Sequence, residues 1–343
     1  MIDPITLARE NIQKLTAYTS ARDEFSGDAK VFLDANENPF GELNRYPDPY
    51  QNELKQLLAE ISHVKPSQLF VGNGSDEIID LVFRIFCNPG KDKALTFSPT
   101  YGMYQVSADI NDIELLTCPL DDQFDIDLDI AFKMLNDHSI KLILICSPNN
   151  PTGNRLNKDR IIELLENFNG IVLVDEAYGE FDEDQNLQEL TTKYGNLIIS
   201  KTMSKAWGLA GARVGYALTN DRMIELLNKV KPPYNVSTPN QQAAIQAMSN
   251  KYKFENRKAI ILSERERMIK ELNALDSVIY IYPSNANFLL VVFTDATATY
   301  HYLLSEGIVV RNRDKLVKNC LRLTIGTETE NNQLLQALNS MKS

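Results

Sequence analysis

Short apolar runs alternate with stretches of helical spacing over residues 90–230. Continuous apolar runs such as 142–146 and 171–174 are typical of strands covered on both faces. Strands are expected near 94–97, 113–117, 142–146, 171–174, 197–200 and 214–218, and helices near 101–109, 126–136, 157–168 and 220–230. This alternation predicts an α/β fold, in which a large domain holds a mostly parallel sheet sandwiched by helices.

The two ends of the chain depart from this alternation. A helix is expected over residues 5–15, and residues 1–30 are interpreted as an N-terminal arm. Further elements are expected before and after this region. A helix is expected over 49–61, a strand over 69–71, and a helix that 72–77 opens and that runs to about 87. Later in the chain we expect a helical stretch over 239–274 with a break near 251–253, strands near 278–282, 287–293, 308–311 and 320–324, and helices near 295–306 and 328–341. We therefore predict a large domain over 31–231 and a smaller α+β domain over 232–343.

Charge and composition narrow the class of protein. The 343 residues carry a net charge of −11, with a pI near 4.9, which disfavours nucleic acid as a partner. No apolar run approaches the roughly 18 residues of a membrane helix, and the N-terminus lacks a signal-peptide pattern. The four cysteines and three histidines lack metal-binding spacing. We expect a cytoplasmic protein with small-molecule substrates, without membrane contact and without a metal.

The stretch 200–215 combines a phosphate cradle with a reactive amine. The hydroxyls of Thr202 and Ser204 can donate to an oxyanion, and Arg213 offers a planar donor fork. Lys205 lies between them, and a neighbouring cation would keep its amine partly neutral, as imine formation requires. Lys201 is expected to be solvated. This combination suits pyridoxal phosphate, whose aldehyde joins a lysine.

Other polar residues follow the expected strands, where ligands of parallel sheets bind. Asp175 closes an apolar strand and could pair with a pyridinium nitrogen, although it could also cap the next turn. Tyr178 and Asn150 could hydrogen-bond the ring oxygen of the cofactor, or serve packing and a turn. Tyr101 could lie flat on the ring. The glycines before Ser75 and Asp76 make either an anion seat at a helix start or an ordinary N-cap.

Eight motifs together resemble one family. They lie at 33–39 (LDANENP), 44–47 (NRYP), 98–104 (SPTYGMY), 146–153 (CSPNNPTG), 174–178 (VDEAY), 202–206 (TMSKA), 209–213 (LAGAR) and 320–326 (CLRLTIG). The chain resembles fold-type I pyridoxal-phosphate aminotransferases, and within them it is similar to the histidinol-phosphate aminotransferases. The resemblance implies transamination between L-histidinol phosphate and 2-oxoglutarate, giving imidazole acetol phosphate and L-glutamate, in histidine biosynthesis.

The same resemblance implies roles for single residues. Lys205 forms a Schiff base with the cofactor and moves the proton, Asp175 pairs with the pyridine nitrogen, and Tyr178 and Asn150 hold the ring oxygen. Tyr101 stacks on the ring. The phosphate is held by Ser75, Asp76, Thr202, Ser204 and Arg213, and by Tyr46 from a partner subunit, which implies a homodimer with a shared site. Substrate anions are bound by Arg322 and Arg311, with Tyr18 and Asn36 as further substrate-binding residues.

Three alternatives remain open at this point. An aromatic aminotransferase or a lyase resembling threonine-phosphate decarboxylase would carry most of the same motifs. A cofactor-sensing transcription regulator would need an additional basic DNA-binding segment. The arginines at 311 and 322, judged by position alone, would be read as surface ion pairs, and only the motif indicates a substrate role.

Overall fold

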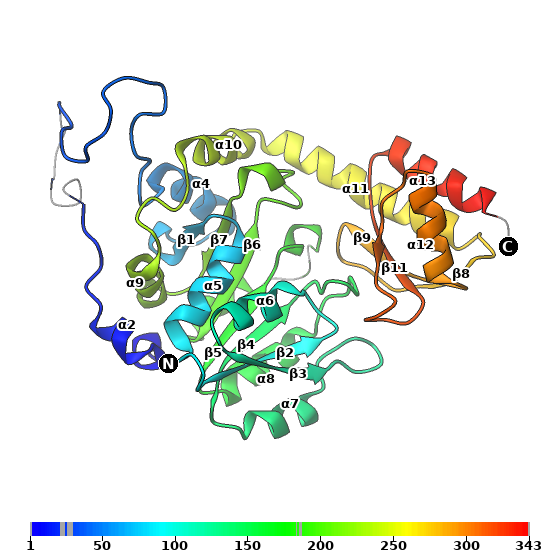
Figure 1. Ribbon diagram of the computed structural model, residues 1–343, viewed down its shortest axis with the longest axis horizontal. Helices are drawn as coiled ribbons and strands as arrows, with labels where there is room; N and C mark the ends of the chain where they lie inside the picture. Colours follow the sequence, from blue (N-terminus) through cyan, green and yellow to red (C-terminus); the bar gives the residue numbers. More distant parts are fainter. Residues whose placement is uncertain (1, 21–24, 26–29, 183, 185–186, 342–343) are drawn as a thin grey trace.

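The computed structural model describes residues 2–20, 25, 30–182, 184 and 187–341. Part of the predicted arm, residues 21–24 and 26–29, lies outside the described residues. The described chain forms two β-sheets, each with its own helices, and Figure 1 shows them side by side. The long helix α11 (Lys251–Leu272) leads from α10 (Thr238–Met248), beside the larger sheet, to the smaller sheet. The predicted fold class, a large α/β part with a smaller α+β part, is confirmed.

The larger sheet has seven strands in the order β1-β7-β6-β5-β4-β2-β3. Their bounds are Leu69–Gly72 (β1), Lys93–Ser98 (β2), Glu114–Pro119 (β3), Ile140–Cys146 (β4), Ile171–Asp175 (β5), Leu197–Thr202 (β6) and Gly215–Leu218 (β7). Strands β2 to β6 pair in parallel, and β7 is antiparallel to both of its neighbours. The carboxyl ends of the parallel strands therefore meet at one edge.

Helices cover both faces of this sheet, which explains its continuous apolar strands. Leu142 and Leu144 of β4 face one core, with α5, α6 and α9, while Ile143 and Ile145 face the other, with α4, α7, α8 and α10. The helix bounds are Asn52–Ser62 (α4), Ser75–Phe86 (α5), Met103–Ile110 (α6), Leu128–Leu135 (α7), Lys158–Asn167 (α8), Asp221–Val230 (α9) and Thr238–Met248 (α10). Short 3-10 turns lie at Pro66–Gln68, Gly179–Phe181, Gln188–Thr192 and Ala210–Ala212.

The smaller sheet has four antiparallel strands in the order β10-β11-β9-β8. The bounds are Val278–Ile281 (β8), Phe288–Phe293 (β9), Arg311–Asn312 (β10) and Cys320–Thr324 (β11), with helices α12 (Ala296–Ser305) and α13 (Glu328–Ser340). Its apolar face packs with α11, α12 and α13 into a separate core that includes Leu289, Leu321 and Leu338. The small sheet thus has an independent hydrophobic interior.

Two predicted elements differ from the structure. The helix expected over 5–15 is split into α1 (Pro4–Leu7) and α2 (Glu10–Lys14), because the N–H of Arg9 donates to the carbonyl of Ile85 at 2.8 Å instead of continuing the helix. The strand expected over 308–311 shrinks to β10, because the N–H of Ile308 caps α12 by donating to Leu303. Among the described helices, none is long and apolar enough to span a membrane.

Candidate active site

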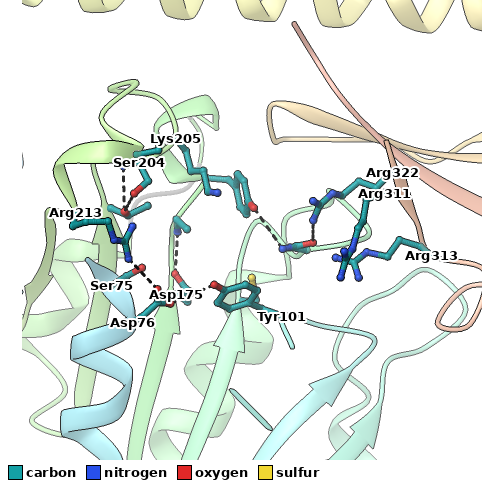
Figure 2. Close-up of a pocket in the computed structure, with 16 residues that line it drawn as sticks. Ser75, Asp76, Tyr101, Asp175, Ser204, Lys205, Arg213, Arg311, Arg313 and Arg322 are labelled. Carbon is teal, nitrogen blue, oxygen red and sulfur yellow. Dashed lines mark hydrogen bonds and ion pairs between the residues drawn. The ribbon is translucent and has the colours of Figure 1, made fainter. Parts of the chain in front are cut away.

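A cavity of about 410 Å³ opens at the carboxyl ends of β4, β5 and β6, on the side that faces the small sheet. It gathers twelve of the residues singled out in the sequence: Ser75, Asp76, Tyr101, Asn150, Asp175, Tyr178, Thr202, Ser204, Lys205, Arg213, Arg311 and Arg322. Figure 2 shows Arg213, Ser75 and Asp76 on one side of the cavity, the three arginines of the small sheet on the other, and Lys205 between them.

Asp175 lies at the end of β5 and is 2% exposed. Its Oδ2 accepts a hydrogen bond of 3.0 Å from the hydroxyl of Tyr104, and its Oδ1 accepts one of 3.1 Å from the N–H of Ala177. Burial raises the pKa of Asp175 to about 6, although both hydrogen bonds oppose the rise. The described residues give this carboxylate no ion pair, so its side chain is an acceptor for a cationic or N–H group.

Lys205 lies in the turn after β6 with its amine 5.7 Å from the centre of the Tyr178 ring. The side chain is exposed to the cavity. Partial burial of the amine and, next in size, the charge of Arg322 lower its pKa, while Asp175 and Asp76 oppose this. A larger share of neutral amine follows, which is the nucleophilic form.

The first turn of α5 forms the floor of one end of the cavity, where free backbone N–H groups favour anions. Nη2 of Arg213 lies 3.2 Å from Oδ2 of Asp76, which orients the guanidinium over this turn. Gly74 is at φ +80°, and a Cβ there would meet Nη2 of Arg213 at 2.6 Å. Only glycine therefore permits the arginine to lie this close to the helix start.

Two hydroxyls complete the same end of the cavity. The hydroxyl of Thr202 donates to Oγ of Ser204 at 3.0 Å, and Oγ1 of Thr202 accepts from the N–H of Ser204 at 3.2 Å. This local turn fixes both side chains after β6. Together with Arg213 and the α5 N-terminus, they provide several donors for one tetrahedral anion.

The middle of the cavity is lined by Asn150, Tyr178 and Tyr101. Nδ2 of Asn150 donates to the hydroxyl of Tyr178 at 3.5 Å, so the two side chains point to one place. The hydroxyl of Tyr101 donates to Oδ1 of Asp76 at 3.3 Å, and its ring meets that of Tyr104 edge to face. The ring of Tyr101 is thereby held at the cavity wall, beside the buried carboxylate of Asp175 in Figure 2.

The small sheet supplies the opposite wall. Arg322 of β11 donates from Nη1 to Oδ1 of Asn150 and lies over the Phe288 ring, with 5.2 Å from its guanidinium carbon to the ring centre. Arg311 of β10 lines the cavity beside it. Arg313 lines it too, and the sequence analysis did not single it out.

Three predicted residues lie apart from the cavity within one chain. Tyr46 is 49% exposed and stacks on Tyr234 with 4.3 Å between ring centres. Asn36 is exposed on the same loop region, and Tyr18 is 69% exposed in the N-terminal segment. These three residues are not brought together with Lys205, and their predicted roles stay predictions.

Comparison with known proteins decides the family. The model of the aminotransferase class I and II family matches residues 15–338, nearly the whole chain. The chain belongs to this family. Members are pyridoxal-phosphate-dependent transaminases, and this chain is therefore one too.

Its relatives narrow the likeness further. A histidinol-phosphate aminotransferase of Bacteroides thetaiotaomicron is 49% identical over 338 residues, covering 97% of each chain. One of Parabacteroides distasonis is 46% identical over 345 residues, covering 100% of each. In fold, the chain matches a crystal structure of histidinol-phosphate aminotransferase from Sinorhizobium meliloti in complex with pyridoxal-5'-phosphate, with a TM-score of 0.80, 24% identity and 90% of each chain covered.

The residues of this class I and II aminotransferase fit the family's cofactor. The cradle at Gly74, which a Cβ would fill, suits a phosphate group held close to the backbone of α5. The buried carboxylate of Asp175 suits the ring nitrogen, since in the part of the chain that the structure describes no cation forms an ion pair with it. The amine of Lys205 lines the same cavity as these two positions.

Sequence reasoning missed two residues and misplaced a third. Tyr104 was part of a quoted motif, and the only hint of its position was its spacing of three from Tyr101 within the helix expected over 101–109. In the structure α6 begins at Met103, after Tyr101. Arg313 lies two residues after Arg311, and residues two apart on a strand share a face, so the sequence did indicate that both arginines could line one site. The expectation that Lys201 is solvated is wrong: its amine is buried 3.0 Å from Oε2 of Glu176 and 3.8 Å from Oε1 of Glu180, because its strand is covered on both faces.

Proposed function

We propose that this chain transfers the amino group of L-histidinol phosphate to 2-oxoglutarate, giving imidazole acetol phosphate and L-glutamate. The observation that carries the proposal is the cavity with a lysine amine at its centre and three arginines on one wall. Both amino donors carry anions, phosphate in one and carboxylates in the other. Guanidinium groups accept either kind. The names of relatives that cover 97% and 100% of this chain, histidinol-phosphate aminotransferases, support histidinol phosphate as the first substrate of the pair.

Pyridoxal phosphate would be held by residues from the whole cavity floor. Lys205 would bind its aldehyde covalently, and Asp175 would pair with the ring nitrogen. Asn150 and Tyr178 would hold the ring oxygen, and Tyr101 would cover the ring. The phosphate would lie among Ser75, Asp76, Thr202, Ser204 and Arg213. When bound, the cofactor supplies an electron sink for the charge that develops at the reacting carbon.

Lys205 would also move the proton. Its lowered pKa leaves part of the amine neutral, so Nζ can accept a proton from the substrate carbon and return it elsewhere. Asp175 would stay ionised against a protonated ring nitrogen, since the ion pair lowers the cost of burying its charge. Arg322, fixed by Asn150, would orient the substrate anion relative to Nζ.

We further propose a homodimer in which Tyr46 of each chain completes the partner's phosphate site. The described residues 30–50 project from the large domain (Figure 1), and Leu33, Phe40 and Leu43 are 91%, 83% and 69% exposed. Large exposed apolar side chains gathered on one projecting segment favour a protein interface. Tyr46 is held on this segment by its stacking on Tyr234.

The function can be tested in two half-reactions. Purified protein loaded with pyridoxal phosphate is mixed with glutamate alone, and pyridoxamine phosphate and 2-oxoglutarate are measured. Imidazole acetol phosphate is then added, and histidinol phosphate is measured. Lys205→Ala is the inactive control. Release of carbon dioxide without amino transfer would replace the proposal with a decarboxylase, and amino transfer that ignores imidazole acetol phosphate would refute the substrate.

A further inference from the structure

Three arginines share one face of the small sheet. Arg311 and Arg322 are directly opposite each other in the antiparallel pair of β10 and β11. Arg313 follows two residues after Arg311, and its N–H still donates to the carbonyl of Cys320 at 2.9 Å, continuing the ladder. Residues two apart in a strand point to the same side, and directly opposite residues do as well. The register therefore aims all three guanidinium groups into the cavity (Figure 2).

This cluster of arginines lacks the compensation that other arginines of the protein receive. Within the described ranges, no carboxylate forms an ion pair with any of the three, whereas Arg213 pairs with Asp76, Arg155 with Asp182 and Arg267 with Glu264. Like charges placed opposite each other on a sheet are destabilising. A bound anionic ligand would offset the repulsion among the three guanidinium groups.

Arg313 is the partly buried member of the cluster whose guanidinium group has no hydrogen bond to a described residue. Burial, and then the charges of Arg322 and Arg311, lower the pKa of Arg313 to about 10. Its Nε is buried without an acceptor among the described atoms, and no hydrogen bond of its guanidinium group to a described residue is present. Arg322, in contrast, is tied to Asn150. The terminal N–H groups of Arg313, which lines the cavity, are thus the donors available to a ligand.

We propose that Arg313 is a specificity-determining residue that makes the site prefer a phosphate monoester, a dianion, over a substrate with a single carboxylate. The inference rests on the proposed function and adds to it the residue that reads the second negative charge. One carboxylate needs one donor fork, which Arg322 provides. A phosphate dianion has three terminal oxygens and twice the charge, so it can engage a second and third guanidinium group at once.

The test compares amino donors that differ in charge. Arg313→Gln, Arg313→Lys and the control Arg257→Gln, an exposed arginine of α11, are assayed with histidinol phosphate, histidinol and phenylalanine. For Arg313→Gln we expect the KM for histidinol phosphate to rise by about tenfold or more, with kcat changed by less than about threefold. The KM values for the other two donors should stay within about twofold, and Arg313→Lys should recover part of the loss.

The outcomes separate the inference from the proposed function. An equal rise for all three donors, or no change for any, would overturn the role of Arg313 while leaving the transaminase assignment intact. Wild-type protein that ignores histidinol phosphate would instead refute the proposed substrate. In that case inhibition of the glutamate half-reaction by inorganic phosphate, at constant ionic strength, still tests Arg313. The inference requires weaker inhibition in Arg313→Gln than in wild type, and unchanged inhibition would overturn it.

Discussion

The hydroxyl of Tyr104 donates a hydrogen bond of 3.0 Å to Oδ2 of Asp175, and both side chains are buried. Tyr104 lies on α6 and Asp175 at the end of β5, so the bond connects a covering helix to the carboxyl edge of the sheet. It lowers the pKa of Asp175 against the larger effect of burial. Tyr104 therefore helps to keep this carboxylate ionised, as its proposed pairing with the ring nitrogen of the cofactor requires.

Replacing Tyr104 by Phe should raise the pKa of Asp175 above its present value of about 6. Because the ionised carboxylate is the form that pairs with a protonated ring, the pH below which cofactor affinity falls should move upward. The dissociation constant of pyridoxal phosphate measured from pH 5 to 8 would show this. Tyr194→Phe, which removes a hydrogen bond to Glu166 far from the cavity, is the control. Identical pH curves for wild type and Tyr104→Phe would contradict the role.

Asp175→Asn should stabilise the cofactor-free protein at pH 8 while removing activity. The carboxyl titrates at 3.8 when unfolded and at about 6 when folded, so the folded chain holds the proton more tightly. The stabilisation from the protonated form is complete below 3.8 and is lost as the pH rises through 6. Asparagine stays neutral and should recover up to about 3 kcal/mol at pH 8.

Denaturant unfolding at pH 8 measures this gain, with Asp122→Asn, an exposed loop carboxylate, as the control. The difference between Asp175→Asn and wild type should shrink towards low pH, where both side chains are neutral. A loss of unfolding free energy for Asp175→Asn at pH 8 would mean that the two hydrogen bonds fully compensate the buried charge, contrary to the raised pKa.

Gly74→Ala should weaken cofactor binding through Arg213. The new Cβ would lie 2.6 Å from Nη2 of Arg213, so the guanidinium has to move away from the start of α5. Loss of one charged donor to a phosphate corresponds to about tenfold or more in the dissociation constant.

Gly307→Ala is a matched control for this change. Its φ of +74° is close to the +80° of Gly74, but a Cβ there has no atom within 4 Å. Both variants should lose about 1–3 kcal/mol of unfolding free energy to backbone strain, with Gly74→Ala towards the upper end because its ψ of 167° lies in a region that essentially only glycine adopts. Only Gly74→Ala should release pyridoxal phosphate. Equal cofactor affinity in the two variants would show that Arg213 can be displaced without consequence.

Lys201→Met should destabilise the large domain strongly. Its amine pairs with the buried Glu176 and lies near Glu180, and these carboxylates outweigh burial to raise the pKa of Lys201. Removing one partner of a buried pair costs about 3–5 kcal/mol, whereas Lys158→Met, whose pair with Glu189 is exposed, should cost less than about 1 kcal/mol. Denaturant unfolding measures both. Adding Glu176→Gln to Lys201→Met should recover part of the loss, and no recovery would argue against the ion pair as the cause.

The sequence predicted the sheet well because its signals are local. Continuous apolar strands and strand-end polar residues are visible in the chain, and they place Asp175, Asn150 and Lys205 at one edge. The split of the first helix was not predictable, because the partner of the Arg9 N–H is the carbonyl of Ile85, 76 residues away. Periodicity contains no information on such a contact.

The positions of the remaining site residues depend on tertiary packing, strand register or a second subunit, which the sequence pattern does not reveal. Tyr104 was part of a quoted motif without a role of its own, and only the position of α6 beside α5 and β3 directs its hydroxyl towards Asp175. Arg313 required the register of β10 and β11, which a two-residue strand signals weakly. Tyr46, Asn36 and Tyr18 lie apart from Lys205 in one chain, so their predicted roles depend on a second subunit.

Because the small sheet has its own hydrophobic interior, mutations could impair substrate binding by its arginines without impairing cofactor binding by the larger sheet. Cavity-forming substitutions around Leu289 or Leu338 would destabilise the small sheet, which carries Arg311, Arg313 and Arg322. The proposed cofactor-binding residues of the larger sheet would stay in place. Such mutants would keep the yellow colour of bound cofactor but would need more substrate for saturation. Random mutagenesis scored by colour and by growth at low substrate would therefore assign each mutation to one of the two sheets.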